Sequence, residues 1–182
     1  MRDRKNVLNS HGFTLLEMML AVAMMAIVVV GIASIVNRQS DQAKANVVAL
    51  QLKTIGEAAG EYIKDAQSTL LQNTQVANSK VIITLPMLQA AGYLNTGFNV
   101  TNGYQQNTCV VVRRAPNPTN NPQLGNDLLG LVVTQGGNAV DDITLGQISA
   151  TIGSGGGAVY AQNTAQVTGA LGGWNFDKTL FE

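Results

Sequence analysis

Apolar residues fill the chain almost without interruption between Phe13 and Val36, and Glu17 is the one charged residue in that run. As an α-helix the run is long enough to cross a hydrocarbon core of about 30 Å. It is also longer than the apolar region of an ordinary secretory signal, which has about 7 to 15 residues. Apolar side chains occur on all sides of the helix, so lipid or other protein must surround it.

The pattern becomes amphipathic after Val36. Apolar residues recur at helical spacing, at Val48, Leu52, Ile55, Ala59, Tyr62 and Ile63. The charged residues of this segment fall mostly on the other faces of the helix. This spacing predicts that the same helix continues through the segment as a half-buried helix. A helix of this kind usually packs on a sheet.

Shorter signals follow along the rest of the chain. Polar residues 66–80 predict a loop, and Thr84, Pro86 and Gly92 predict a short helix capped by Thr84. Apolar β-rich runs predict strands at 109–112 and 128–133, on either side of a proline-rich loop. The remaining predictions are a helix capped by Asp141-Asp142 that carries Leu145, Ile148 and Ile152, a GSGGG turn at 153–157, a strand at 158–162, and core positions for Trp174 and Phe176.

Composition excludes some classes of function. Charged residues make up 12% of the chain and the formal net charge is zero, so there is no basic footprint for nucleic acid. Cys109 is the single cysteine, which rules out an intrachain disulfide, and we expect it as a small apolar side chain in a core strand. The single histidine, His11, precedes the apolar run, so residues 13–182 cannot form a Ser-His or Cys-His catalytic pair.

The charges around the apolar run indicate its orientation. Arg2, Arg4 and Lys5 outweigh Asp3 ahead of it, and basic residues beside an apolar segment hold that end in the cytoplasm. A carboxylate inside a membrane helix is costly and by default functional. Taken alone, Glu17 fits either a functional partner or a place near the lipid headgroups.

The segment Gly12-Phe13-Thr14-Leu15-Leu16-Glu17, followed by apolar residues, resembles the type III signal of prepilins. This resemblance implies that prepilin peptidase cuts between Gly12 and Phe13, and that the new amine of Phe13 is methylated. The helix then stays on the mature protein. We therefore expect a leader at 1–12, an apolar transmembrane and filament-core helix at 13–37, and a periplasmic globular pilin domain at 38–182.

Cleavage would create a cationic amine at Phe13 within a core of packed apolar helices. Removing one member of a buried charge pair typically costs about 3 to 5 kcal/mol. The Glu17 carboxylate of a neighbouring subunit would neutralise the amine. The pair would therefore fix the axial register of assembly.

A second resemblance covers roughly residues 40–176. It rests on AAGEYIKD, VIITLPMLQAAGYLNTGF, CVVVRRAPNPTNNPQ, LLGLVVTQGG and TGALGGW, which are similar to the pilin domain of shufflon-type minor pilins of type IVb pili. Those thin pili are encoded by conjugative plasmids, and their minor pilins carry a C-terminal region that recombination varies and that recognises the recipient cell. Since the sequence ends at Glu182, we expect it to lack that tip region.

Other chemistry is less favoured by the residues. The GSGGG segment lacks the Lys-Ser/Thr of a phosphate loop, which favours a turn. Asp141-Asp142 could bind calcium, but no alternating ligand run follows, so a helix cap is favoured. We expect no cofactor, no metal and no catalytic site.

These observations predict an α+β pilin fold in which the long N-terminal helix packs on a small antiparallel sheet. The predicted function is a structural subunit of a type IVb-like pilus, most consistent with a minor pilin that serves conjugation or attachment. Major pilin and type II secretion pseudopilin remain alternatives. The expected partners are prepilin peptidase, other pilin subunits and the inner-membrane assembly platform. We expect residence in a bacterial inner membrane and then in an extracellular pilus.

Overall fold

The computed structural model describes residues 14–75, 79–115 and 127–181. The chain divides into two compact units, Met1–Asp41 and Gln42–Glu182. Helix α1 (Leu15–Asp65) supplies most of what is described of the first unit and continues into the second. The architecture is α+β, with an N-terminal apolar helix, shorter helices and small antiparallel sheets, as the sequence predicted.

Sheet A has the strand order β1-β2-β3, with β1 at Lys80–Thr84, β2 at Asn107–Arg114 and β3 at Leu128–Gln135. Both pairings are antiparallel, and the register aligns Lys80 with Arg113 and Arg113 with Leu129. The predicted runs at 109–112 and 128–133 therefore form neighbouring strands. Strand β1 was not predicted, because its apolar run Val81–Ile83 is too short to show alternation.

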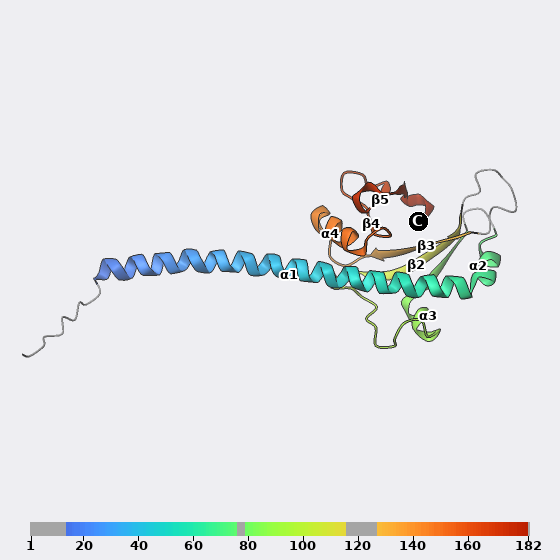
Figure 1. The fold of residues 1–182 in the computed structure, drawn as a ribbon, viewed down its shortest axis with the longest axis horizontal. Helices are drawn as coiled ribbons and strands as arrows, with labels where there is room; N and C mark the ends of the chain where they lie inside the picture. Colours follow the sequence, from blue (N-terminus) through green and yellow to red (C-terminus); the bar gives the residue numbers. More distant parts are fainter. Residues whose placement is uncertain (1–13, 76–78, 116–126, 182) are drawn as a thin grey trace, which may run out of the picture. The chain divides into compact units, whose positions relative to one another are not determined.

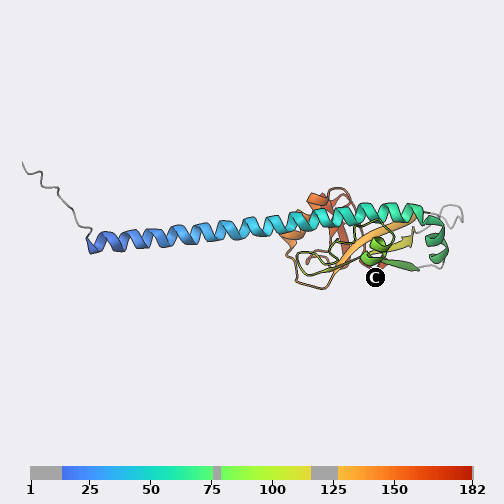
Figure 2. The same cartoon turned by 90° about the horizontal axis from the view of Figure 1, so that it is seen from below.

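One face of sheet A packs on the second half of α1, and both ribbon views show these strands lying along it (Figures 1 and 2). The cluster is formed by Ile55, Ala58 and Ala59 of α1 together with Leu70, Ile83, Leu85, Leu88, Leu94, Val110 and Val112. Alternate residues of a strand face opposite sides, so Val111 and Arg113 face away from α1. They are nevertheless buried, with 5% and 8% of their surface exposed.

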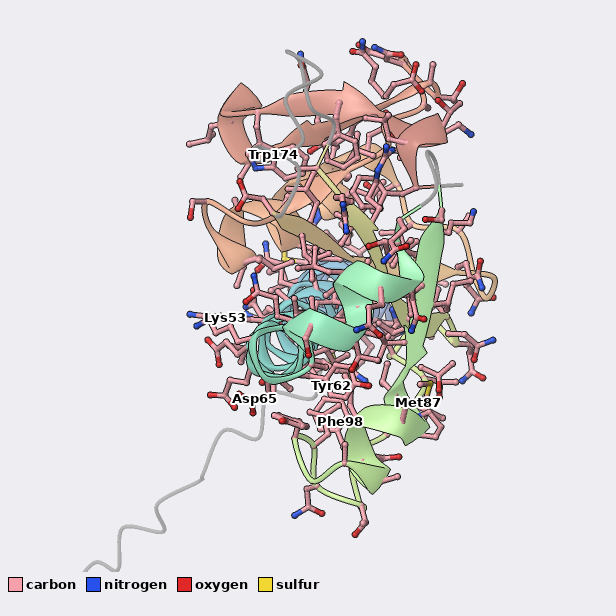
Figure 3. All side chains as sticks on the ribbon, turned by 90° about the vertical axis from the view of Figure 1, so that its right-hand side faces the viewer. Lys53, Tyr62, Asp65, Met87, Phe98 and Trp174 are labelled. Atoms are coloured by element: carbon pink, nitrogen blue, oxygen red, sulfur yellow. The ribbon has the colours of Figure 1, made fainter. Side chains whose placement is uncertain are left out.

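The C-terminal segment covers that opposite face. Sheet B has the order β4-β5-β6, with β4 at Gly157–Ala158, β5 at Gln166–Gly169 and β6 at Asn175–Asp177. Arg113 donates from Nη1 to the Leu180 carbonyl at 2.7 Å, and its guanidinium lies 5.9 Å from the centre of the Phe181 ring. Viewed along α1, Trp174 lies in this far layer, whereas Tyr62 and Phe98 lie on the other side of the molecule (Figure 3).

The short helices are α2 (Gln67–Asn73), α3 (Leu85–Ala90) and α4 (Asp142–Ile152), with 3-10 turns at Ala170–Gly172 and Lys178–Leu180. Helix α3 follows the predicted Thr84-Pro86-Gly92 pattern, although the Thr84 side chain makes no capping hydrogen bond. Asp141 caps α4 as predicted, and Gly153 ends it with φ +93°. Ile148 of α4 packs on Ala45, Val48 and Ala49 of α1.

Four sequence predictions need correction. The 66–80 loop contains α2, which forms around the buried Leu70. The strand at 158–162 is shorter, since β4 ends at Ala158. Trp174 and Phe176 are half-buried and lie outside the core clusters. Cys109 lies in β2 but is likewise half-buried, and burial raises the pKa of its thiol.

Candidate functional site: the first turns of α1

Helix α1 begins with a turn built on Thr14. The backbone N–H groups of Glu17 and Met18 donate to the Thr14 carbonyl at 3.0 and 3.1 Å. The Glu17 N–H also lies 3.3 Å from the Thr14 hydroxyl oxygen, which accepts a hydrogen bond from it. This is the Ser/Thr-x-x-Glu pattern of a helix start, and Thr14 is the one residue of the site whose role the sequence analysis missed.

Glu17 therefore lies in the first turn of α1, where the helix dipole favours a negative charge. Its neighbours Leu15, Leu16 and Met18 are all exposed, at 80%, 80% and 56%. The helix thus presents one carboxylate within a surface that is otherwise apolar. Gly12 and Phe13, the predicted cleavage and methylation positions, lie outside the described residues.

The apolar surface extends far beyond that turn. Leu15–Ile32 has a mean hydropathy of 2.6 and is long and apolar enough to cross a membrane, and none of it is buried by the residues that the structure describes. Side chains of this type need lipid or protein around them. Glu17 is the only charged residue in this span, so whatever surrounds the helix must also accommodate the carboxylate.

Among its described residues, the globular unit has one surface hollow to compare with this site. A shallow hollow of about 440 Å³ is lined by Asp142, Ile143, Tyr160, Gln162, Asn163 and Thr168. Both carboxylate oxygens of Asp142 accept from the Ala161 N–H, at 3.1 and 3.3 Å. Within the ranges that the structure describes, no three His, Cys, Asp or Glu side chains gather closely enough to hold a metal ion.

The aspartates considered for calcium have structural contacts instead. The Asp141 carboxylate accepts from the backbone N–H groups of Ile143 and Thr144 at 3.1 and 3.0 Å, and from the Thr144 hydroxyl at 2.7 Å. These hydrogen bonds hold the pKa of Asp141 below its usual value, and the bond from the Thr144 hydroxyl has the largest effect. The arrangement is that of a helix cap.

Two family models match the chain. Residues 8–33 match the prokaryotic N-terminal methylation motif, which includes the first turns of α1. Residues 38–181 match the model described as bacterial shufflon protein, N-terminal constant region. The chain belongs to the shufflon protein family. The methylation motif ahead of that region makes it a type IV pilin-like subunit with a structural role.

Individual relatives agree with this assignment. The pilin is 35% identical over 120 residues to shufflon proteins A', C' and B of Escherichia coli, and the match covers 65% of this chain. It spans about a quarter of those relatives, at 26%, 25% and 25% of their lengths. No solved structure matches the pilin.

Proposed function

We propose that this pilin is a structural subunit of a type IVb-like pilus, most consistent with a minor pilin, that assembles through α1. The single observation that carries the proposal is the exposed apolar span Leu15–Ile32 with one carboxylate in its first turn, inside a matched methylation motif. A surface of this kind suits lipid before assembly and packed α1 helices afterwards.

Processing at the N-terminus is the first step of the proposal. Prepilin peptidase cuts between Gly12 and Phe13, and Phe13 is methylated on its new amine. Glycine suits the position before the cut because it has no side chain to hinder the peptidase. The cut removes Arg2, Arg4 and Lys5 and leaves Glu17 near the new terminus.

Assembly then depends on charge pairing. The Phe13 ammonium of an incoming subunit pairs with the Glu17 carboxylate of a neighbour in the filament core. Each charge alone would be costly among apolar side chains. The pair therefore selects the axial position at which the new subunit stops.

The proposal also assigns a location and partners. Basic residues ahead of the apolar run keep that end cytoplasmic, so the globular unit lies in the periplasm before extraction. The partners are prepilin peptidase, the inner-membrane assembly platform and other pilin subunits. The proposed use of the filament is conjugation or cell attachment, which is what the resemblance to shufflon-type minor pilins implies. No catalytic step is assigned.

Two alternatives remain in the same structural class. A major pilin would form most of the mass of the filament, and counting subunits in purified pili separates it from a minor pilin. A type II secretion pseudopilin would act on export. The capping bonds of Asp141 favour pilus function over a calcium-dependent pseudopilin, because they occupy the carboxylate considered as a calcium ligand.

The proposal is tested on protein recovered from sheared filaments. Mass spectrometry should find a chain that begins at Phe13 with a methylated amine. Gly12→Val should leave the precursor, heavier by the leader, in the inner membrane. Wild-type protein that still begins at Met1 would contradict the proposal.

A further inference from the structure

Sheet A has two edges that pair with no second strand in the part of the chain that the structure describes: β1 on one side and β3 on the other. Strand β3 reads LLGLVVTQ, eight residues without charge or proline. Natural proteins usually protect such edges with charges, proline or bulges, because an open apolar edge accepts strands from other molecules. The edge of β3 therefore requires a physical explanation.

Strand directions limit what can pair there. β2 runs antiparallel to both neighbours, so β1 and β3 run parallel to each other. Subunits that enter a filament from one membrane share one orientation, and this step rests on the proposed function. The β3 edge of one copy can then receive β1 of the next copy only as a parallel strand. Such a contact is head-to-tail and does not close, which is what a filament needs.

Opposite charges lie at the starts of these two strands. Lys80 is the first residue of β1, and Asp127 immediately precedes β3; both are exposed. The register places Lys80 in the same row as Leu129, and Asp127 is two residues before Leu129. Since side chains alternate along a strand, Lys80 and Asp127 are assigned to the same face.

The same alignment also joins two exposed apolar side chains. When Lys80 of one copy lies opposite Asp127 of another, Ile82 comes opposite Leu129, two residues further along each strand. These are the large apolar side chains of sheet A with the most exposed surface, at 52% for Ile82 and 42% for Leu129. One register thus provides both a charge pair and an apolar pair, the two kinds of contact that stabilise neighbouring strands.

We propose that β3 of one copy receives β1 of a second copy as a parallel strand, in the register that pairs Asp127 with Lys80 and Leu129 with Ile82. Each cross-strand pair contributes modestly. The contact therefore aligns the globular units of copies that α1 has already brought together. The contact needs only two neighbouring copies, so it applies to a minor pilin that occurs in short runs as well as to a major pilin.

Disulfide trapping in full-length protein tests this contact directly. Neighbouring strands lie about 4.8 Å apart, so β1 and β3 of one copy are separated by roughly 10 Å across β2. A disulfide needs Cα atoms within about 7 Å. In a Cys109→Ala background, a bond between cysteines at 80 and 127 therefore reports contact between copies.

We expect Lys80→Cys with Asp127→Cys, and Ile82→Cys with Leu129→Cys, to give dimers and higher ladders in sheared filaments. Thr84→Cys with Asp127→Cys is the matched control, because it is out of register by four residues, about 13 Å along the strand. Each single cysteine variant should stay monomeric on a non-reducing gel.

Charge reversal provides a second measurement that does not depend on cysteine. Lys80→Glu and Asp127→Lys should each lower the number of copies in sheared filaments about fivefold, the equilibrium effect of like charges at one cross-strand position. Combining the two reverses the pair and should restore at least half of the wild-type number.

Ladders from the in-register pairs, together with rescue by the double reversal, support the contact. The edge contact is wrong if wild-type subunits are present in sheared filaments but the in-register pairs give no more ladder than the control, or the double reversal gives no rescue. In that case the filament role stands. Absence of the wild-type subunit from sheared filaments would contradict the filament role and the edge contact together.

Discussion

Two exposed aspartates show how single residues set local structure in the globular unit. Asp141 caps α4, and Asp177 caps the 3-10 turn Lys178–Leu180 by accepting from the Thr179 N–H at 2.9 Å and from its hydroxyl at 2.8 Å. In both cases these hydrogen bonds stabilise the carboxylate and lower its pKa. Both caps are therefore stronger when the aspartate is charged.

This dependence predicts an acid-sensitive contribution from Asp141. Its pKa in the folded state is below the unfolded value of about 3.9, so its contribution to stability is complete above that value and is lost as pH falls through the folded pKa. Asp141→Asn keeps a capping oxygen but cannot titrate.

Thermal melts of the detergent-solubilised full chain check the prediction. Between about pH 6 and about pH 3, the melting temperature should fall less for Asp141→Asn than for the wild type. Equal losses in the two proteins would show that the cap does not contribute through its charge.

Among the smaller elements, sheet B packs closely against Trp174. Its indole lies against Gly157 and Gly169, which are cross-strand partners in β4 and β5. The indole N–H donates to the Ser154 carbonyl at 2.8 Å, and the ring stacks on Phe176 with 5.3 Å between centroids. A Cβ on Gly169 would lie 2.6 Å from atoms of the indole.

Gly169→Ala should therefore displace Trp174 and lower the free energy of unfolding by about 1 to 3 kcal/mol, the usual range for overpacking. Gly155→Ala is the matched control, since a Cβ there meets nothing within 4 Å. Urea unfolding of the two variants beside the wild type measures the difference. If both variants unfold at the same urea concentration, the packing of Trp174 on β5 does not hold sheet B together.

The predictability of each element followed its length and its caps. α1 has an apolar run followed by a long amphipathic period, and α4 has Asp141 before it and Gly153 after it, so both were predicted. β5 and β6 have four and three residues, too few to show alternation. α2 has a mostly polar sequence and becomes helical where Leu70 can be buried, which is a tertiary effect.

The same distinction applies to the candidate sites. Gly12, Phe13 and Glu17 lie within six consecutive residues, so a linear pattern suffices to propose them. Lys80 and Asp127 lie in different strands, and nothing in the sequence states that β1 and β3 share a sheet with β2 between them. Their alignment follows only from the strand register, and periodicity cannot supply it.

Across the whole molecule, α1 belongs to both compact units, and its side chains have different surroundings in each. In the first unit its described side chains between Leu15 and Ile32 are exposed and apolar, whereas in the second unit Ile55 and Ala59 of the same helix are buried against sheet A. One helix thus joins a folded pilin domain to a segment that needs lipid or other subunits around it. In the proposed function, Glu17, the only charge in that segment, sets the position at which subunits meet.

The most direct test measures how many copies of each Glu17 variant are present in sheared filaments. A blot of the same cells reports whether the leader has been cleaved. Glu17→Ala should be cleaved like the wild type, because the peptidase acts on the other side of Phe13. Its copies in filaments should fall by about 100-fold or more, since an unpaired buried ammonium costs about 3 to 5 kcal/mol. Glu17→Asp should be intermediate, because the charge remains but the side chain is one methylene shorter. Glu17→Gln should resemble alanine, because an amide carries no charge to neutralise the ammonium. A Glu17→Ala protein that is cleaved and enters filaments at the wild-type level would contradict pairing between Phe13 and Glu17.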